Sequence, residues 1–132
     1  MNVHSGKRKS AIARGVFRKG NGKITVNNMP VDIYAQGFYA MKITEPAILL
    51  LELAKKVDIS IKVNGGGMNG QADACRIVVA KALLDFSGND DAVEKILLDY
   101  DRNMLIADVR RKEQRKPNTG GKARAKTQKS YR

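Results

Sequence analysis

The sequence has few of the residues on which metal, redox and disulfide chemistry depend. It contains one cysteine, Cys75, and one histidine, His4, in 132 residues. A single cysteine cannot form an intrachain disulfide, and one cysteine with one histidine cannot supply the usual ligands of a zinc site. We therefore expect no metal, no cofactor and no catalytic residue. The scarcity of cysteine also predicts a reducing, cytoplasmic location.

The sequence also has no long apolar run. The most apolar stretch, residues 47–54, is interrupted by Glu52 and is far shorter than the roughly 20 residues that cross a bilayer. The first ten residues hold no apolar segment of the kind that a signal peptide needs. These features predict a chain with no membrane partner.

Aromatic side chains are rare as well: they make up 5% of the residues, and there is no tryptophan. Apart from Tyr131, they do not alternate with basic residues, as they would in a protein that stacks on single-stranded nucleic acid. We therefore expect any nucleic acid to be recognised through its backbone and its shape.

Basic charge is abundant, and it is concentrated at the two ends. The formal net charge of +12 divides into +7 for residues 1–23, −4 for residues 24–108 and +9 for residues 109–132. The last segment has almost no apolar side chain that could form a core, so it needs a polyanion to fold against. The sequence predicts a globular domain over residues 1–108 and a basic C-terminal extension, residues 109–132, that becomes ordered on RNA.

The basic flanks and a glycine-rich loop are the predicted contacts with RNA or a similar polyanion. The residues are Lys7, Arg8, Lys9, Arg14, Arg18, Lys19, Lys23, Gly65, Gly66, Gly67, Arg110, Arg111, Lys112, Arg115, Lys116, Lys122, Arg124 and Lys126. The glycines lie between a predicted strand and a predicted helix, where backbone N–H groups could contact a phosphate. The same glycines could instead serve only a sharp turn that requires a positive φ.

Hydrophobic periodicity predicts an α+β domain. Strands are predicted at residues 10–18, 23–27, 57–63 and 107–112, and helices at residues 44–56, at residues 69–86 and after a cap at Asn89. In the first strand, Arg14, Val16 and Arg18 share one face. Thr44 is expected to cap the first helix, and residues 34–39 are expected to be irregular.

Seven segments, in order and with fitting spacings, make the chain resemble one protein family. They are GKRKSAIARG (Gly6–Gly15), GNGKITVNNMPV (Gly20–Val31), ITEPAILLLE (Ile43–Glu52), VDISIKVNGGG (Val57–Gly67), GQADACRIVVAKALLDF (Gly70–Phe86), LLDYDRNMLIADVRRKE (Leu97–Glu113) and GGKARAKTQKSYR (Gly120–Arg132). The family is that of the ninth protein of the small ribosomal subunit, in its archaeal and eukaryotic branch. Residues 114–119 depart from the pattern of this family.

The resemblance implies a fold, a set of partners and a role for the end of the chain. The implied fold is α+β: a small, mainly antiparallel sheet covered by helices, with a left-handed β-α-β crossover and a long basic C-terminal tail. The implied partners are the ribosomal RNA of the subunit head, neighbouring ribosomal proteins and the transfer RNA in the peptidyl site. The residues expected to touch transfer RNA are Lys129, Ser130, Tyr131 and Arg132.

From the residues and this resemblance we expect a structural constituent of the small ribosomal subunit, not an enzyme. One alternative is a small kinase-like domain that binds a nucleotide at residues 65–70, with Asp73 as the acid near the loop. A second alternative is a free RNA chaperone without sequence preference.

Overall fold

A small five-stranded sheet forms the base of the domain in the computed structural model, which describes residues 2–125. The strands are β1 (His4–Arg8), β2 (Ala11–Lys19), β3 (Ile24–Val26), β4 (Met29–Pro30) and β5 (Val57–Asn64), in the order β1-β2-β5-β3-β4. Only the β3–β5 pair is parallel. The predicted α+β class with a mainly antiparallel sheet is therefore confirmed.

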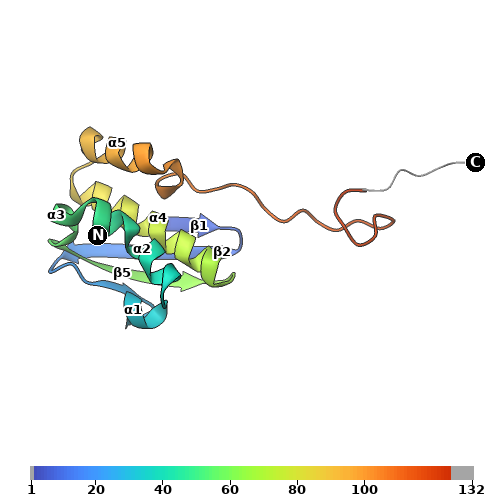
Figure 1. The fold of residues 1–132 in the computed structure, drawn as a ribbon, viewed down its shortest axis with the longest axis horizontal. Helices are drawn as coiled ribbons and strands as arrows, with labels where there is room; N and C mark the ends of the chain where they lie inside the picture. Colours follow the sequence, from blue (N-terminus) through green and yellow to red (C-terminus); the bar gives the residue numbers. More distant parts are fainter. Residues whose placement is uncertain (1, 126–132) are drawn as a thin grey trace, which may run out of the picture.

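Helices lie on one side of this sheet (Figure 1). They are α1 (Val31–Tyr34), α2 (Phe38–Leu49), α3 (Leu51–Ala54), α4 (Met68–Phe86), α5 (Asp91–Tyr100) and the short 3-10 helix η1 (Arg102–Met104). α4 lies against β1, β2 and β5, and α2 packs on α4. The chain passes from β3 to its parallel neighbour β5 through β4, α1, α2 and α3, so a β-α-β crossover is present. Its left-handedness stays a prediction.

The centre of the sheet forms because β5 alternates strictly between apolar and polar residues. Ile59, Ile61 and Val63 are buried beneath α4, whereas Ser60 and Lys62 are exposed on the other face. Removing such apolar side chains from water is the main force that holds the layers together. The predicted strand 57–63 and helix 69–86 are thus confirmed within one residue at their ends.

Two predictions fail where tertiary contacts override local signals. The helix expected from Thr44 begins at Phe38, because buried Ile43 and Pro46 hold α2 against the core. Of residues 34–39, which were expected to be irregular, only 35–37 are, since Tyr34 ends α1 and α2 begins at Phe38. Thr44 Oγ1 donates to the carbonyl of Ala40 at 3.0 Å instead of capping. The strand expected at residues 107–112 does not form, because the chain leaves the domain there and no strand lies beside it.

Two further boundaries differ from expectation. The strand expected at residues 10–18 is one half of a hairpin, in which β1 pairs with β2 across a turn where Lys9 has a φ of 53°. α5 is capped by Asp90, whose Oδ1 accepts the N–H of Ala92 at 3.0 Å. Asn89, the expected cap, lies one residue earlier with a φ of 59°.

Beyond η1, the described chain has no further helix or strand and leads away from the domain (Figure 1). It folds back once, because Arg124 Nε lies 2.9 Å from Glu113 Oε2 and the N–H of Lys116 donates to the carbonyl of Lys122 at 3.2 Å. We call residues 113–124 the tail loop. None of the helices within residues 2–125 combines the length and apolarity needed to cross a membrane.

Candidate nucleic-acid interface

The sheet face turned away from the helices carries basic side chains. Arg14 and Arg18 are exposed there on β2, with Val16 half-buried between them, as the alternation predicted. In the strand register, Arg14 lies directly opposite Lys62 of β5, and Arg18 lies opposite Asp58. Lys62 was not among the predicted site residues, although its alternation with buried neighbours already placed it on the polar face of its strand.

The Arg14–Lys62 pair is unfavourable for the free domain. Like charges directly opposite each other on neighbouring strands repel, and this costs stability. A phosphate group placed over the pair would be attracted by both. Lys7, exposed on β1 opposite Ile12, extends the same face. The charge of the open sheet face is therefore suited to attract a polyanion.

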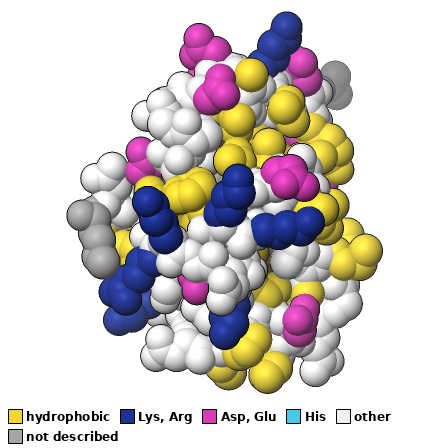
Figure 2. All heavy atoms as spheres, turned by 90° about the vertical axis from the view of Figure 1, so that its left-hand side faces the viewer, with side chains coloured by type: hydrophobic (Ala, Val, Ile, Leu, Met, Phe, Trp, Pro, Cys, Tyr) yellow, Lys and Arg dark blue, Asp and Glu magenta, His cyan; other side chains and the backbone are white. Residues whose placement is uncertain are grey.

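The carboxylate of Asp58 accepts hydrogen bonds from the turn between β2 and β3. Its Oδ1 accepts the backbone N–H of Lys23 at 2.8 Å and that of Asn21 at 2.9 Å. These two N–H groups, Lys23 first, hold the pKa of the Asp58 carboxyl below its usual range. The predicted contacts Lys19 and Lys23 are exposed beside this turn. Figure 2 shows the side of the molecule that lies to the left in Figure 1. Lys and Arg side chains spread across the middle and lower left of this view.

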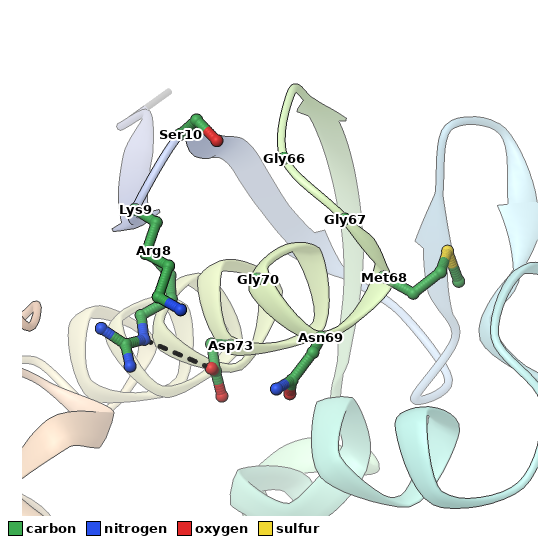
Figure 3. A pocket seen from close by; sticks show the side chains of 9 residues that line it. All are labelled: Arg8, Lys9, Ser10, Gly66, Gly67, Met68, Asn69, Gly70 and Asp73. Carbon is green, nitrogen blue, oxygen red and sulfur yellow. Dashed lines mark ion pairs between the residues drawn. The ribbon is translucent and has the colours of Figure 1, made fainter. Parts of the chain in front are cut away.

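A second basic site lies at the β1–β2 turn, where it meets the glycine loop and the start of α4 (Figure 3). A cavity of about 330 Å³ is lined by Arg8, Lys9, Ser10, Gly66, Gly67, Met68, Asn69, Gly70 and Asp73. α4 begins after Gly67 without a side-chain cap. The N–H groups of the first turn of a helix have no partner within the helix, and they favour anions.

The three predicted glycines differ in what the fold requires of them. Gly65 has a φ of 77°, and a Cβ there would lie 2.6 Å from the carbonyl oxygen of Ser10. Gly66 has a φ of 67°, and its Cβ would lie 3.0 Å from the backbone nitrogen of Ala11. Both are needed for the turn itself. Gly67 has a φ of −113° and no atom within 4 Å of an added Cβ, so contact with a ligand can be tested there without disturbing the turn.

Arg8 connects the start of the tail to the domain. Its Nη1 lies 2.8 Å from Asp108 Oδ2, and its Nε lies 3.5 Å from Asp73 Oδ2. Lys42 Nζ approaches the other oxygen of Asp73 at 2.6 Å. Arg110 hydrogen-bonds Asp108 and holds the pKa of that carboxyl far below its usual range. Arg8 was predicted to contact RNA, and its guanidinium group lies between two carboxylates of its own chain.

The same contacts bear on the kinase-like alternative. Asp73, the acid that such a site would require, is held by Arg8 and Lys42. Among residues 2–125, no group of three or more His, Cys, Asp or Glu side chains is placed to hold a metal ion. The geometry around the glycine loop therefore gives no support to phosphoryl transfer.

The first residues of the tail add to the basic site at the β1–β2 turn. Lys9, Ser10, Arg110, Arg111 and Lys112 line an open groove of about 570 Å³. Farther along, Lys112, Arg115, Lys116, Lys122 and Arg124 are exposed, and Arg124 pairs with Glu113. The two basic flanks of the sequence thus meet at one end of the domain. The predicted contacts Lys126, Lys129, Ser130, Tyr131 and Arg132 lie outside the described residues.

Comparison with known proteins shows similarity along almost the whole chain. The family described as "Ribosomal protein S9/S16" matches residues 6–132. Three relatives from archaea are each named "Small ribosomal subunit protein uS9". The protein from Methanothrix thermoacetophila is 46% identical over 97% of this chain and 96% of its own. The proteins from Picrophilus torridus and Thermoplasma acidophilum are 47% and 45% identical, each over 98% of this chain and over 96% and 99% of their own lengths.

Proposed function

This chain belongs to the ribosomal protein S9/S16 family, and we propose that it binds the ribosomal RNA of the small-subunit head through its basic surfaces. The observation that best supports this proposal is the open sheet face, where Arg14 and Lys62 repel each other across two neighbouring strands. Such a pair becomes favourable only when an anion lies over it. The relatives' shared name, that of a small-subunit protein, supports ribosomal RNA as this anion.

The domain and the tail have different parts in this proposal. The sheet face and the cavity at the glycine loop contact phosphates, and residues 109–132 become ordered along RNA because they carry a net charge of +9 and little apolar surface. Lys129, Ser130, Tyr131 and Arg132 reach the transfer RNA in the peptidyl site. This last assignment rests on the family resemblance. Charged contacts to phosphates fix position without reading base sequence.

The proposal describes a structural protein with no catalytic role, working on cytoplasmic ribosomes beside other proteins of the subunit head. Sedimentation of a cell lysate tests it. The chain should migrate with the small subunit and remain there after a wash at moderate salt. Migration with free proteins at the top of the gradient would contradict the proposal and favour a free RNA chaperone.

The salt dependence of binding tests the electrostatic basis. With roughly six to ten phosphate contacts, the affinity of the free protein for RNA should fall on the order of 10³-fold between low and moderate salt. A nearly flat dependence would mean that shape and apolar contacts dominate.

The role of the tail is tested by deleting residues 129–132. Small subunits with the truncated protein should assemble, but they should bind several transfer RNAs more weakly and to a similar degree in filter binding. Arg132→Lys should have a milder effect, since a guanidinium group binds phosphate in a two-pronged geometry that an ammonium group lacks. Unchanged binding of every transfer RNA would confine the tail to ribosomal RNA.

A further inference from the structure

The outer face of α2 carries large apolar side chains that nothing in the described chain covers. Phe38 and Met41 are each 68% exposed, and Ile48 is 65% exposed. Their spacing of three and seven residues places them in one stripe along the helix. Tyr100 of α5, 55% exposed, lies beside this stripe. A contiguous apolar patch of this kind on a soluble protein marks an interaction site.

The patch has a defined shape. A groove of about 460 Å³ runs between α2 and α5, and its lining includes the apolar Phe38, Met41, Ile48 and Tyr100 and the charged Lys42, Glu45 and Arg76. Polar contacts fix its floor: Arg76 Nε lies 2.7 Å from Glu45 Oε2, and the hydroxyl of Tyr100 donates to Glu45 Oε1 at 2.6 Å. Because these side chains are already ordered, little conformational freedom is lost when a partner binds.

The charge around the groove argues against RNA as the occupant. Lys42 and Arg76, the basic residues of its lining, are already paired, Lys42 with Asp73 and Arg76 with Glu45 and Asp101. α5, which contributes Tyr100 to the lining, exposes Asp91, Glu94 and Asp99 and a single lysine, Lys95. In Figure 2, acidic side chains gather at the top of the molecule, and hydrophobic side chains run down the right-hand side. A phosphate backbone would be repelled by the acids and would leave the apolar stripe exposed to water. A protein surface with apolar side chains flanked by Lys or Arg complements both features.

The position of the groove also favours a protein, not RNA, as its occupant. α4 lies on the sheet and α2 lies on α4, so the outer face of α2 is turned away from the basic sheet face (Figure 1). We propose that the stripe Phe38–Met41–Ile48, with Tyr100, is the docking site for another protein of the ribosomal particle, which inserts apolar side chains between lysines or arginines. The inference rests on the proposed function in assigning the opposite face to RNA.

The double variant Met41→Lys/Ile48→Lys distinguishes the two kinds of partner, because lysine should strengthen binding to RNA and weaken binding to a basic protein surface. We expect the variant to fold as the wild type does and to bind free RNA at least as well. Its retention on washed small subunits should be on the order of tenfold weaker. Val3→Lys, at an exposed apolar position ahead of β1, is the control and should be retained normally.

Photocrosslinking identifies the occupant directly. With benzoylphenylalanine in place of Phe38, small subunits should yield a crosslink to another ribosomal protein, at a segment that contains apolar residues beside Lys or Arg. The same label at Val3 should not produce it. A crosslink to RNA, a crosslink to a second copy of this chain, or no crosslink while the chain is present in the subunits would overturn the docking site alone. Absence of the chain from the subunits would overturn the proposed function as well.

Discussion

Reversing the charge of Arg14 and Arg18 one at a time should separate RNA binding from folding, because the two arginines have opposite neighbours. Arg14 faces Lys62, so Arg14→Glu replaces a repelling pair with an attracting one and should stabilise the free domain by about 0.2–1 kcal/mol. Arg18 faces Asp58, so Arg18→Glu creates a repelling pair and should destabilise the domain by about the same amount.

Both substitutions should weaken RNA binding, whatever they do to stability. Each phosphate contact contributes about 0.7–0.9 to the slope of log affinity against log salt concentration. Either variant should therefore lower this slope by about 0.7–0.9, and the double variant by about twice as much. Arg14→Glu would thus be a protein that is more stable and binds less tightly.

Urea denaturation of the free protein measures the first effect, and filter binding to small-subunit RNA over a salt series measures the second. Lys95→Glu is the matched control, since it changes the net charge equally at an exposed position of α5, which packs on α2, α4 and η1. If Lys95→Glu weakened RNA binding as much as Arg14→Glu does, overall charge would explain the result and the sheet face would not be the contact. Stability changes of the same sign in both arginine variants would refute the register argument.

Three further predictions concern the domain. Burial raises the pKa of the Cys75 thiol to about 12, so at pH 8 a thiol reagent such as Ellman's reagent should react only after unfolding in guanidinium. Gly65→Ala should destabilise the domain by about 2 kcal/mol in urea titration, whereas Gly67→Ala should change stability by less than about 0.5 kcal/mol and reduce RNA affinity. Burial opposes ionisation of Asp101, but the N–H of Asn103 and the Arg76 guanidinium outweigh it and lower the pKa. The stabilisation is therefore complete above the unfolded-state pKa of about 3.9 and is lost as pH falls through the lower folded-state value, so Asp101→Asn should cost about 1 kcal/mol at pH 7 and nothing in strong acid.

The sequence predicts the parts of the fold in which local and tertiary preferences agree. In β5, buried Ile59 and Ile61 alternate with polar residues, and α4 repeats apolar residues at helical spacing, so both elements were predicted with nearly correct ends. β1 was missed because its residues, HSGKR, contain no apolar alternation. It exists because Gly6 lets it approach α4 closely: a Cβ there would lie 2.2 Å from the carbonyl oxygen of Ala74.

The candidate site also combines features that follow from a local pattern with features that depend on tertiary contacts. That Arg14 and Arg18 share an exposed face follows from alternation along one strand. That Arg14 faces Lys62 depends on the pairing of two residues 48 positions apart in sequence, which no local pattern specifies. The ion pairs of Arg8 likewise require Asp73 of α4 and Asp108, directly before the tail, to converge on β1.

The tail loop, residues 113–124, sets how far the end of the chain can extend. An extended chain advances about 3.3 Å per residue, so the 11 residue steps between Glu113 and Arg124 could span roughly 35 Å. The ion pair that closes the loop brings Glu113 and Arg124 together, so the loop adds almost none of this length to the reach of the chain. Because this pair is exposed, competing phosphates can separate it. In the proposed function, RNA phosphates would replace Glu113 as the partner of Arg124, and the tail loop would then open and make this length available.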